Sequence, residues 1–541
     1  MSSTTATPYS GSVATHRPKL DTKPSLATIA LFIALLLGGL AFMIFSLSKD
    51  VSGSGAAAET TTYTPFILLG VALFIALAFE FVNGFHDTAN AVATVIYTHS
   101  LPANFAVVWS GMFNFIGVLV SSGAVAFGII SLLPVELILQ VGSHAGFAMV
   151  FALLIAAIVW NLGTWWLGLP ASSSHTLIGS IIGVGVANAL MHGRSGTTGV
   201  DWGQATKVGY SLLLSPLIGF GFAALLLLVL RIFVKRKELY VAPESAEPPP
   251  WWIRGLLVLT CTGVSFAHGS NDGQKGMGLI MLILVGTVPI SYALNRAMPE
   301  SATTQFVAEA TVTQQLLVKA GGSPTTTSAN AREALSEYLS TKKYAPEVLP
   351  ALAKISGDIG DQVKVYGSLA RVPAAAIPNV RNDMYLASEA IRALGKSQDV
   401  KLDADTQKNL DAFKRLIDAA TKFIPLWVKV VVAIALGLGT MVGWKRIVQT
   451  VGERIGKTHL TYAQGASAEV VAMATIGAAD AFGLPVSTTH VLSSGVAGTM
   501  AANKSGLQMS TIRNIAMAWV LTLPAAMLLS GSLYWLLSKI I

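Results

Sequence analysis

The chain has 541 residues, of which 53% are hydrophobic and only 12% charged, and its mean hydropathy is +0.61. Soluble domains carry about 25% charged residues, so the composition excludes an ordinary water-soluble protein and indicates one embedded in a lipid bilayer. The single cysteine, Cys261, excludes a disulfide within the chain. The net charge of +8 could serve nucleic acid, but the basic residues stand beside hydrophobic runs, as membrane topology requires. We therefore expect no nucleic-acid partner.

The N-terminal part of the chain is predicted to contain a tail and one membrane helix. Residues 1–25 are rich in Ser, Thr and Pro and include several basic residues, a composition typical of a disordered tail. Residues 26–48 contain an apolar run long enough to span the roughly 30 Å hydrocarbon layer. Because only a weak cleavage site follows this run, we predict an additional transmembrane helix and not a removed signal peptide.

Further apolar segments predict an all-α polytopic membrane protein. They cover about residues 64–97, 101–133, 143–167, 170–191, 205–234, 251–293, 425–443, 466–483, 486–503 and 510–539. The segments at 64–97 and 251–293 are too long for one straight span and are interrupted by polar residues and glycine, so we expect broken helices there. The segments at 170–191 and 486–503 are short, begin at Leu-Pro and are rich in hydroxyl groups. We expect them to be re-entrant helices.

Two strongly basic loops set the expected orientation. Residues 231–254 and 445–457 are rich in Lys and Arg and should therefore lie in the cytoplasm. The long hydrophilic stretch at 299–424 then falls on the opposite, periplasmic side, where we expect a soluble helical insertion. The same alternation of spans places the N-terminus in the cytoplasm and the C-terminus in the periplasm of a bacterial inner membrane.

Two motifs occur twice, in the same order. The first is Asn83-Gly-Phe-His-Asp87-Thr-Ala-Asn90, which returns as His268-Gly-Ser-Asn-Asp272-Gly-Gln-Lys275. The second is Gly168-Leu-Pro-Ala-Ser172-Ser-Ser-His175, which returns as Gly483-Leu-Pro-Val-Ser487-Thr-Thr-His490. So many matched positions at one spacing indicate an internal duplication.

The duplication predicts a first transport repeat at 64–234 and a second at 251–298 and 425–541, joined by a cytoplasmic linker at 235–250. The insertion at 299–424 divides the second repeat. Because the two repeats begin on opposite sides of the membrane, they are predicted to be inverted. Inverted repeats place substrate and ion sites near the bilayer midplane, where the repeats meet.

The repeated aspartates are the first candidate site residues. An ionised side chain in an apolar helix costs at least about 2.5–3.5 kcal/mol, so Asp87 and Asp272 are predicted to be functional. The alternative is that each caps the second half of a broken helix. Asn90 and Lys275 lie three residues further along and share the helical faces of the aspartates. A buried Lys275 is expected to pair with Asp272 and to add positive charge to an anion site.

The hydroxyl clusters form the second candidate site. They comprise Ser172, Ser173 and Ser174 in the first copy and Ser487, Thr488 and Thr489 in the second. Each follows a proline suited to a helix N-terminus, where hydroxyls and free N–H groups can bind an oxyanion. The alternative is that they cap the helix or join helices together. His175 and His490 could each be a ligand, a proton carrier or a packed hydrogen-bonding residue. Glu469 is a candidate proton or cation relay.

These motifs resemble those of the inorganic phosphate transporter family, the Pit or PiT group, and most closely its bacterial low-affinity Pit branch. The resemblance covers 64–539 apart from the insertion. It implies uptake of phosphate as a neutral metal–phosphate complex with protons, and a homodimer. It places Asp87 and Asp272 at the centre, with Ser172 and Ser487 opening the hydroxyl clusters, and it matches Glu469 to a glutamate used in transport.

Two departures from the family signature favour proton coupling over a sodium site. His86 and Lys275 stand where the signature has asparagine, and a cation beside Asp272 weakens a sodium site there. The predicted proton or cation coupling residues are His86, Asp87, Asp272 and Glu469. The predicted substrate-binding residues are Asp87, Asn90, Ser172, Ser173, Ser174, Asn271, Asp272, Lys275, Ser487, Thr488 and Thr489.

The predicted function is import of inorganic phosphate by secondary active transport with proton symport, through alternating access between the repeats. We expect no permanently bound cofactor; a divalent metal such as Mg²⁺ would travel with phosphate. A sulfate or other oxyanion permease is the alternative on the same scaffold. An intramembrane hydrolase using Ser173 or Ser174 with His175 is disfavoured, because these neighbours do not face one another on a helix and no nucleophile elbow is present. A sensor built on 299–424 is a third possibility.

Overall fold

The computed structural model describes residues 18, 20, 25–53, 64–87, 89–133, 138, 143–243, 245–321, 327–397 and 399–540. These residues form α-helices joined by short loops, and no β-strand occurs among them. Seven of the described helices are long and apolar enough to cross a membrane, or up to eight if the bent pair α16 and α17 is one span. This confirms the predicted all-α membrane architecture. Most of the predicted tail lies outside the described residues.

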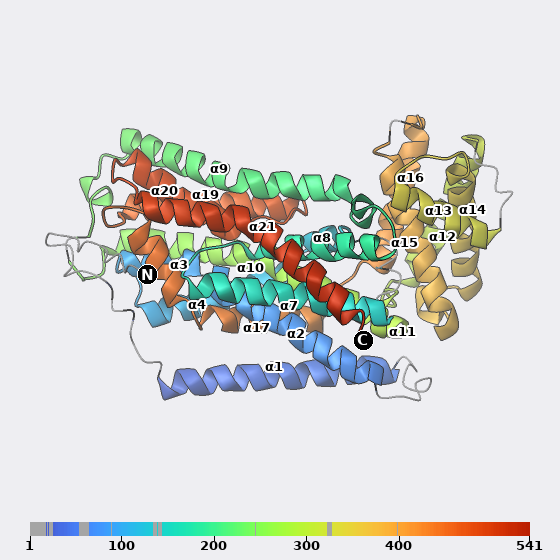
Figure 1. Ribbon diagram of the computed structural model, residues 1–541, viewed down its shortest axis with the longest axis horizontal. Coiled ribbons are helices and arrows are strands. Elements are labelled where there is room, and N and C mark those ends of the chain that lie inside the picture. The colour runs from blue at the N-terminus through green and yellow to red at the C-terminus, as the bar shows by residue number, and fades with distance from the viewer. Residues whose placement is uncertain are drawn as a thin grey trace.

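The first half of the chain supplies the helices α1 to α9. Their bounds are α1 (Leu26–Gly53), α2 (Thr64–Asp87), α3 (Ala89–Tyr97), α4 (Ala103–Val120), α5 (Ala124–Ile130), α7 (His144–Trp166), α8 (Ser173–Met191) and α9 (Trp202–Phe233). The second half supplies α10 (Trp251–Thr287), α11 (Pro289–Tyr292), α17 (Leu426–Thr440), α18 (Lys445–Gln449), α19 (Tyr462–Ala481), α20 (Thr488–Ala502) and α21 (Met509–Leu537). Long helices run side by side along the molecule, and α1 lies along one edge of this bundle (Figure 1).

Helices of the first half pack against helices of the second half in two pairs. Helix α8 packs against α21, and α9 packs against α20. Small residues bring these helices together: a Cβ added to Gly183 would lie 2.2 Å from the Met527 carbonyl oxygen, and one on Gly219 would lie 2.2 Å from that of Val491. Between helices in a membrane, such small residues allow close backbone packing. Each half therefore contributes one long helix, α9 or α21, that packs against the hydroxyl-bearing helix of the other half.

The expected break at the second aspartate motif is wrong. Helix α10 runs without interruption from Trp251 to Thr287, and the long apolar segment divides only at Val288. The motif glycines pack against neighbouring helices instead: a Cβ on Gly269 would lie 2.1 Å from the Asn114 carbonyl oxygen of α4. In the first copy, Thr88 between α2 and α3 lies outside the described residues. An unpredicted break separates α4 from α5 at Gly123, whose φ of +86° is left-handed.

The insertion forms a separate group of helices at one end of the bundle (Figure 1). It contains α12 (Glu300–Lys319), α13 (Ser328–Thr341), α14 (Val348–Tyr366), α15 (Ile377–Leu394) and α16 (Ala404–Thr421), which share their own apolar core. Ion pairs join it to the bundle: Asp201, the N-cap of α9, lies 2.8 Å from Arg392 of α15 and 3.7 Å from Lys342. The Asp201 carboxylate therefore caps α9 and also joins the insertion to the membrane bundle.

Asp201→Asn is expected to lower the thermal unfolding midpoint by a few degrees at pH 7. Asparagine can still cap α9, but the partly buried carboxylate loses its ion pairs with Arg392 and Lys342, which contribute about 1 kcal/mol. Burial alone would raise the pKa of Asp201, but Lys342, the Gln204 amide and Arg392 together hold it below its ordinary value. A lowered carboxyl pKa stabilises the fold above the ordinary pKa of about 3.9 and loses this contribution as the pH falls below it. Intrinsic fluorescence on heating measures the midpoint.

The matched control for this prediction is Asp411→Asn, at an exposed position on α16, which should leave the midpoint unchanged. The difference between wild type and Asp201→Asn should shrink below pH 4. An undiminished difference at low pH would show that the charge of Asp201 is not the source of its effect.

Candidate functional site

Asp87, at the end of α2, joins parts of both halves of the chain. One carboxylate oxygen, Oδ2, accepts a hydrogen bond of 2.5 Å from the Ser173 hydroxyl at the start of α8. The other, Oδ1, accepts one of 2.7 Å from the Thr489 hydroxyl at the start of α20 and lies 3.0 Å from Nδ1 of His86. All four side chains are buried. One carboxylate thus gathers hydroxyl groups from both copies of the second motif.

The second aspartate, Asp272, lies nearby on α10 and forms the predicted buried ion pair with Lys275. Nζ of Lys275 is 2.7 Å from Oδ2 of Asp272, and both side chains are fully buried. Nζ also donates a hydrogen bond of 3.4 Å to the Ser173 hydroxyl. The other oxygen of Asp272, Oδ1, has no hydrogen-bond partner among the described residues. Lys275 therefore links Asp272 to the hydroxyl that also binds Asp87.

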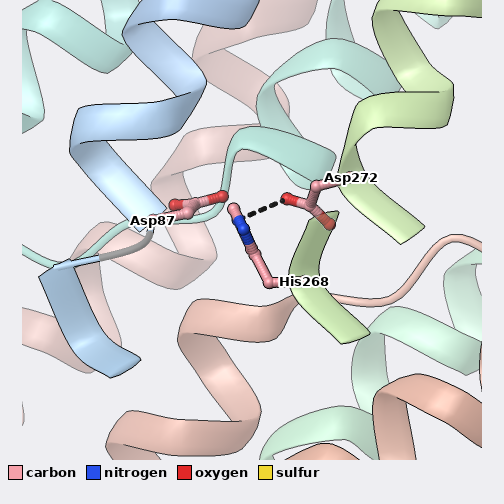
Figure 2. Close-up of side chains that lie close together, drawn as sticks. All are labelled: Asp87, His268 and Asp272. Atoms are coloured by element: carbon pink, nitrogen blue, oxygen red, sulfur yellow. Dashed lines mark ion pairs between the residues drawn. The ribbon is translucent and has the colours of Figure 1, made fainter. Parts of the chain in front are cut away.

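Asp87, His268 and Asp272 form a candidate cation site. Each offers one ligand atom, and these atoms lie within 4.8 Å of one another; Figure 2 shows the three side chains converging from α2 and α10. Nε2 of His268 is 3.4 Å from Oδ2 of Asp272, and its Nδ1 is 2.9 Å from the Asn114 side-chain oxygen. Carboxylate and imidazole ligands suit divalent metals such as Mn²⁺, while Mg²⁺ prefers oxygen ligands and water.

The first hydroxyl of each cluster caps its own helix. Ser172 accepts a hydrogen bond from the His175 amide, and Ser487 accepts one from the His490 amide. For these two residues the structure supports the capping alternative. The later hydroxyls are placed differently. Ser174 donates to the Val486 carbonyl at 2.8 Å, while the buried Thr488 hydroxyl has no partner among the described residues. The two helix N-termini and their remaining hydroxyls are the groups of this region that could bind an oxyanion.

His175 and His490 pack together. Their ring centroids are 4.5 Å apart, and the His490 ring stacks on Trp519 at 4.1 Å. The Ser173 hydroxyl donates to Asp87, and the Ser174 hydroxyl donates to the Val486 carbonyl. The structure therefore supports the packing interpretation of these histidines, and within the described residues no Ser–His pair of a hydrolase is formed.

The remaining predicted residues lie around this centre. His86 reaches the Thr164 hydroxyl at 3.1 Å through Nε2. The side-chain amide of Asn271 donates to the Leu484 carbonyl and accepts a hydrogen bond from the Val486 amide. It therefore positions the backbone just before α20. Asn90 belongs to α3, but its side chain lies outside the described residues.

Glu469 is separate from the aspartates. It is fully buried in α19, where it accepts a hydrogen bond from the Thr260 hydroxyl of α10. The structure thus does not bring this predicted coupling residue into contact with Asp87 or Asp272.

Sequence reasoning missed two residues of this region. His268 precedes Asp272 by one helical turn, so the spacing alone places it on the same face. Glu80 lies two turns before Asp87 in α2 and is fully buried. An acidic residue inside an apolar run was the available signal, because such residues are rare in membrane helices without a function.

A bundle of apolar helices enclosing carboxylates, a lysine and two hydroxyl-bearing helix starts defines a membrane transport protein with an intramembrane binding site. The sequence profile of the "Phosphate transporter family" matches residues 83–530, and the chain belongs to this family. It is thus a multi-pass membrane transporter and not an enzyme.

The most similar relatives include two proteins of Escherichia coli K12. The "Low-affinity inorganic phosphate transporter PitA" is 43% identical over 487 residues, which cover 87% of this chain and 96% of that protein. The "Low-affinity inorganic phosphate transporter PitB" is 41% identical over 515 residues, covering 88% and 98%. A solved structure, "The sodium-dependent phosphate transporter", is 19% identical with a TM-score of 0.49 and covers 88% of this chain and 100% of its own.

Proposed function

We propose that this chain imports inorganic phosphate together with a divalent cation and protons. The observation that carries the proposal is the binding of Asp87 by hydroxyls from both α8 and α20, beside Asp272. Family membership and the similarity to the phosphate transporters PitA and PitB support phosphate as the substrate. The hydroxyls and helix N-termini supply the donors that a tetrahedral oxyanion needs.

Electrostatics requires a cation or proton to accompany phosphate. Like charges 4 Å apart repel by about 4 kcal/mol at an effective dielectric constant of 20. Lys275 offsets only one of the two aspartates, so a phosphate dianion would meet a surplus negative charge. In the proposed bound state, Asp87, His268 and Asp272 hold the cation. Ser173, Thr488 and Thr489 turn to the phosphate oxygens, and His86 and Glu469 serve proton coupling.

Alternating access is proposed to move the two halves against each other. The helix pairs α8 with α21 and α9 with α20 support two equivalent repeats that meet at the site. The described parts of both basic loops contact the same end of the bundle. In the first loop, Arg254 donates to the Ser100 carbonyl and Arg231 to the Asn503 side chain. In the second loop, the Lys457 amide donates to the Gly506 carbonyl. The insertion lies at the opposite end (Figure 1). This supports a cytoplasmic N-terminus and a periplasmic insertion.

Uptake of labelled phosphate into proteoliposomes is expected to require Mg²⁺ or another divalent cation. An inward proton gradient should accelerate it, while a sodium gradient of equal size should not. The physical reason is the need to neutralise phosphate beside Asp87 and Asp272. Empty liposomes give the background. Uptake that ignores Mg²⁺ and protons but follows sodium would contradict the proposed coupling.

Competition separates phosphate from the alternative oxyanions. Arsenate, which has the charge and shape of phosphate, should inhibit uptake, and excess sulfate should not. Inhibition by sulfate at similar concentrations would favour a general oxyanion permease.

The homodimer stays a prediction, to be measured by the mass of the detergent-solubilised protein. Deleting 299–424 tests the sensor alternative, which predicts a change in regulation, while an accessory domain would leave uptake intact.

A further inference from the structure

Glu80 is a fully buried carboxyl that the proposed cycle does not yet use. It lies in α2 against α10, where a Cβ added to Gly276 would be only 2.2 Å from its Cγ. Its Oε2 accepts one long hydrogen bond of 3.4 Å from Asn83, and Oε1 has no partner among the described residues. A carboxyl in this position, inside a membrane helix, is expected to have a function.

The charged groups that act on Glu80 belong to α10. Lys275, the neighbour of Gly276, attracts the carboxylate of Glu80, and Asp272 repels it. At present the Lys275 ammonium is paired with Asp272 at 2.7 Å, and no ion pair of the described residues joins it to Glu80. One ammonium therefore lies under the influence of two buried carboxylates and is bonded to one of them.

Other helices packed against α2 bring few charged or titratable side chains. Lys429 of α17 donates to the Ser121 carbonyl, His144 is the first residue of α7, and His175 of α8 stacks on His490. Tyr97, at the far end of α3, donates to Glu453. From α10 the remaining groups are Arg254, near its start, and His268; α2 itself adds His86 and Asp87. Lys275 is thus the buried cation available to Glu80.

We propose that Glu80 is the second counter-ion of Lys275. When the cargo cation occupies Asp272, the ammonium is displaced from that carboxylate and moves to Glu80, which keeps it paired inside the membrane. Unpaired buried charges are strongly unfavourable, so without Glu80 the lysine would stay on Asp272 and compete with the cation. Glu80 is a positioning residue, and the inference rests on the cation binding of the proposed function.

Binding of Mn²⁺ to the full chain in lipid nanodiscs, followed by electron paramagnetic resonance, tests this coupling. E80Q should raise the dissociation constant about tenfold, a difference of about 1.4 kcal/mol. K275M should bind Mn²⁺ at least as tightly as wild type, because the competitor is gone. The double variant E80Q/K275M should match K275M within about twofold, since non-additivity identifies residues that act through each other.

Two control variants accompany this comparison of the single and double variants. E80D, which keeps the charge, should bind within about threefold of wild type, and E238Q, at an exposed position, should be unchanged. Size-exclusion chromatography monitors folding; if E80Q aggregates, E80D and the double variant still carry the test. Equal weakening in E80Q and E80Q/K275M would overturn the inference while leaving the cation site intact. A wild type that binds no Mn²⁺ would overturn the cation site itself, and the inference with it.

Discussion

Asp87→Asn is expected to reduce phosphate uptake by at least about a hundredfold, the effect of losing roughly 3 kcal/mol from a buried charged centre. Both oxygens of Asp87 accept hydrogen bonds, from Ser173 and from Thr489. An asparagine has one oxygen acceptor and presents an NH₂ donor at the other position, so one hydroxyl loses its acceptor. The variant also removes a negative charge that would hold the cation of the proposed function.

Initial rates of labelled phosphate uptake in proteoliposomes, corrected for the amount of protein inserted, measure this effect. Asp411→Asn, on the exposed face of α16, makes the same chemical change away from the site and should transport normally. If Asp87→Asn retains uptake within about twofold of wild type, an effect under 0.5 kcal/mol, Asp87 is not the centre of the transport site.

Gly84→Ala is expected to destabilise the protein by about 3 kcal/mol, at the upper end of the usual range for overpacking. A Cβ at this position would lie 2.2 Å from the Leu436 carbonyl oxygen and 3.1 Å from Cα of Gly439. These are backbone atoms of α17 and cannot move aside as a side chain can, so α2 and α17 would have to separate. The loss should appear as a lower thermal midpoint and less monodisperse protein in detergent.

Gly70→Ala is the matched control for this prediction. It lies in the same helix, and a Cβ there would meet nothing within 4 Å. Since alanine is the better helix former by up to about 1 kcal/mol, Gly70→Ala should be neutral or slightly stabilising. Equal midpoints for the two variants would show that the contact between Gly84 and α17 does not contribute to stability.

The glycines around the two aspartates show where sequence reasoning gave the wrong physical cause. The glycines and polar residues of the two long segments at 64–97 and 251–293 predicted broken helices. In the structure, the equivalent residues Gly84 and Gly269 instead allow close packing, the first on α17 and the second on Asn114 of α4. These partners are distant in sequence, and local patterns carry no information about them.

Local features of the site were predictable. The proline followed by hydroxyl residues marks a helix start, and Ser172 and Ser487 cap α8 and α20 as such a pattern allows. The i, i+3 spacing of Asp272 and Lys275 likewise predicts their ion pair. The meeting of Ser173 and Thr489 on one carboxylate was not predictable in detail, because it depends on how α8 and α20 are brought together by α21 and α9.

The hydroxyls on Asp87 also bear on how tightly the transporter can hold its substrate. Before phosphate arrives, Ser173 and Thr489 already have a negatively charged acceptor. In the proposed bound state these hydroxyls turn to phosphate, which must therefore exchange one set of bonds for another, so that each contact would add little net affinity. The same proposed exchange would lower the barrier to release, because Asp87 would recapture its donors as phosphate leaves. Such a site favours rapid turnover where phosphate is plentiful over scavenging where it is scarce.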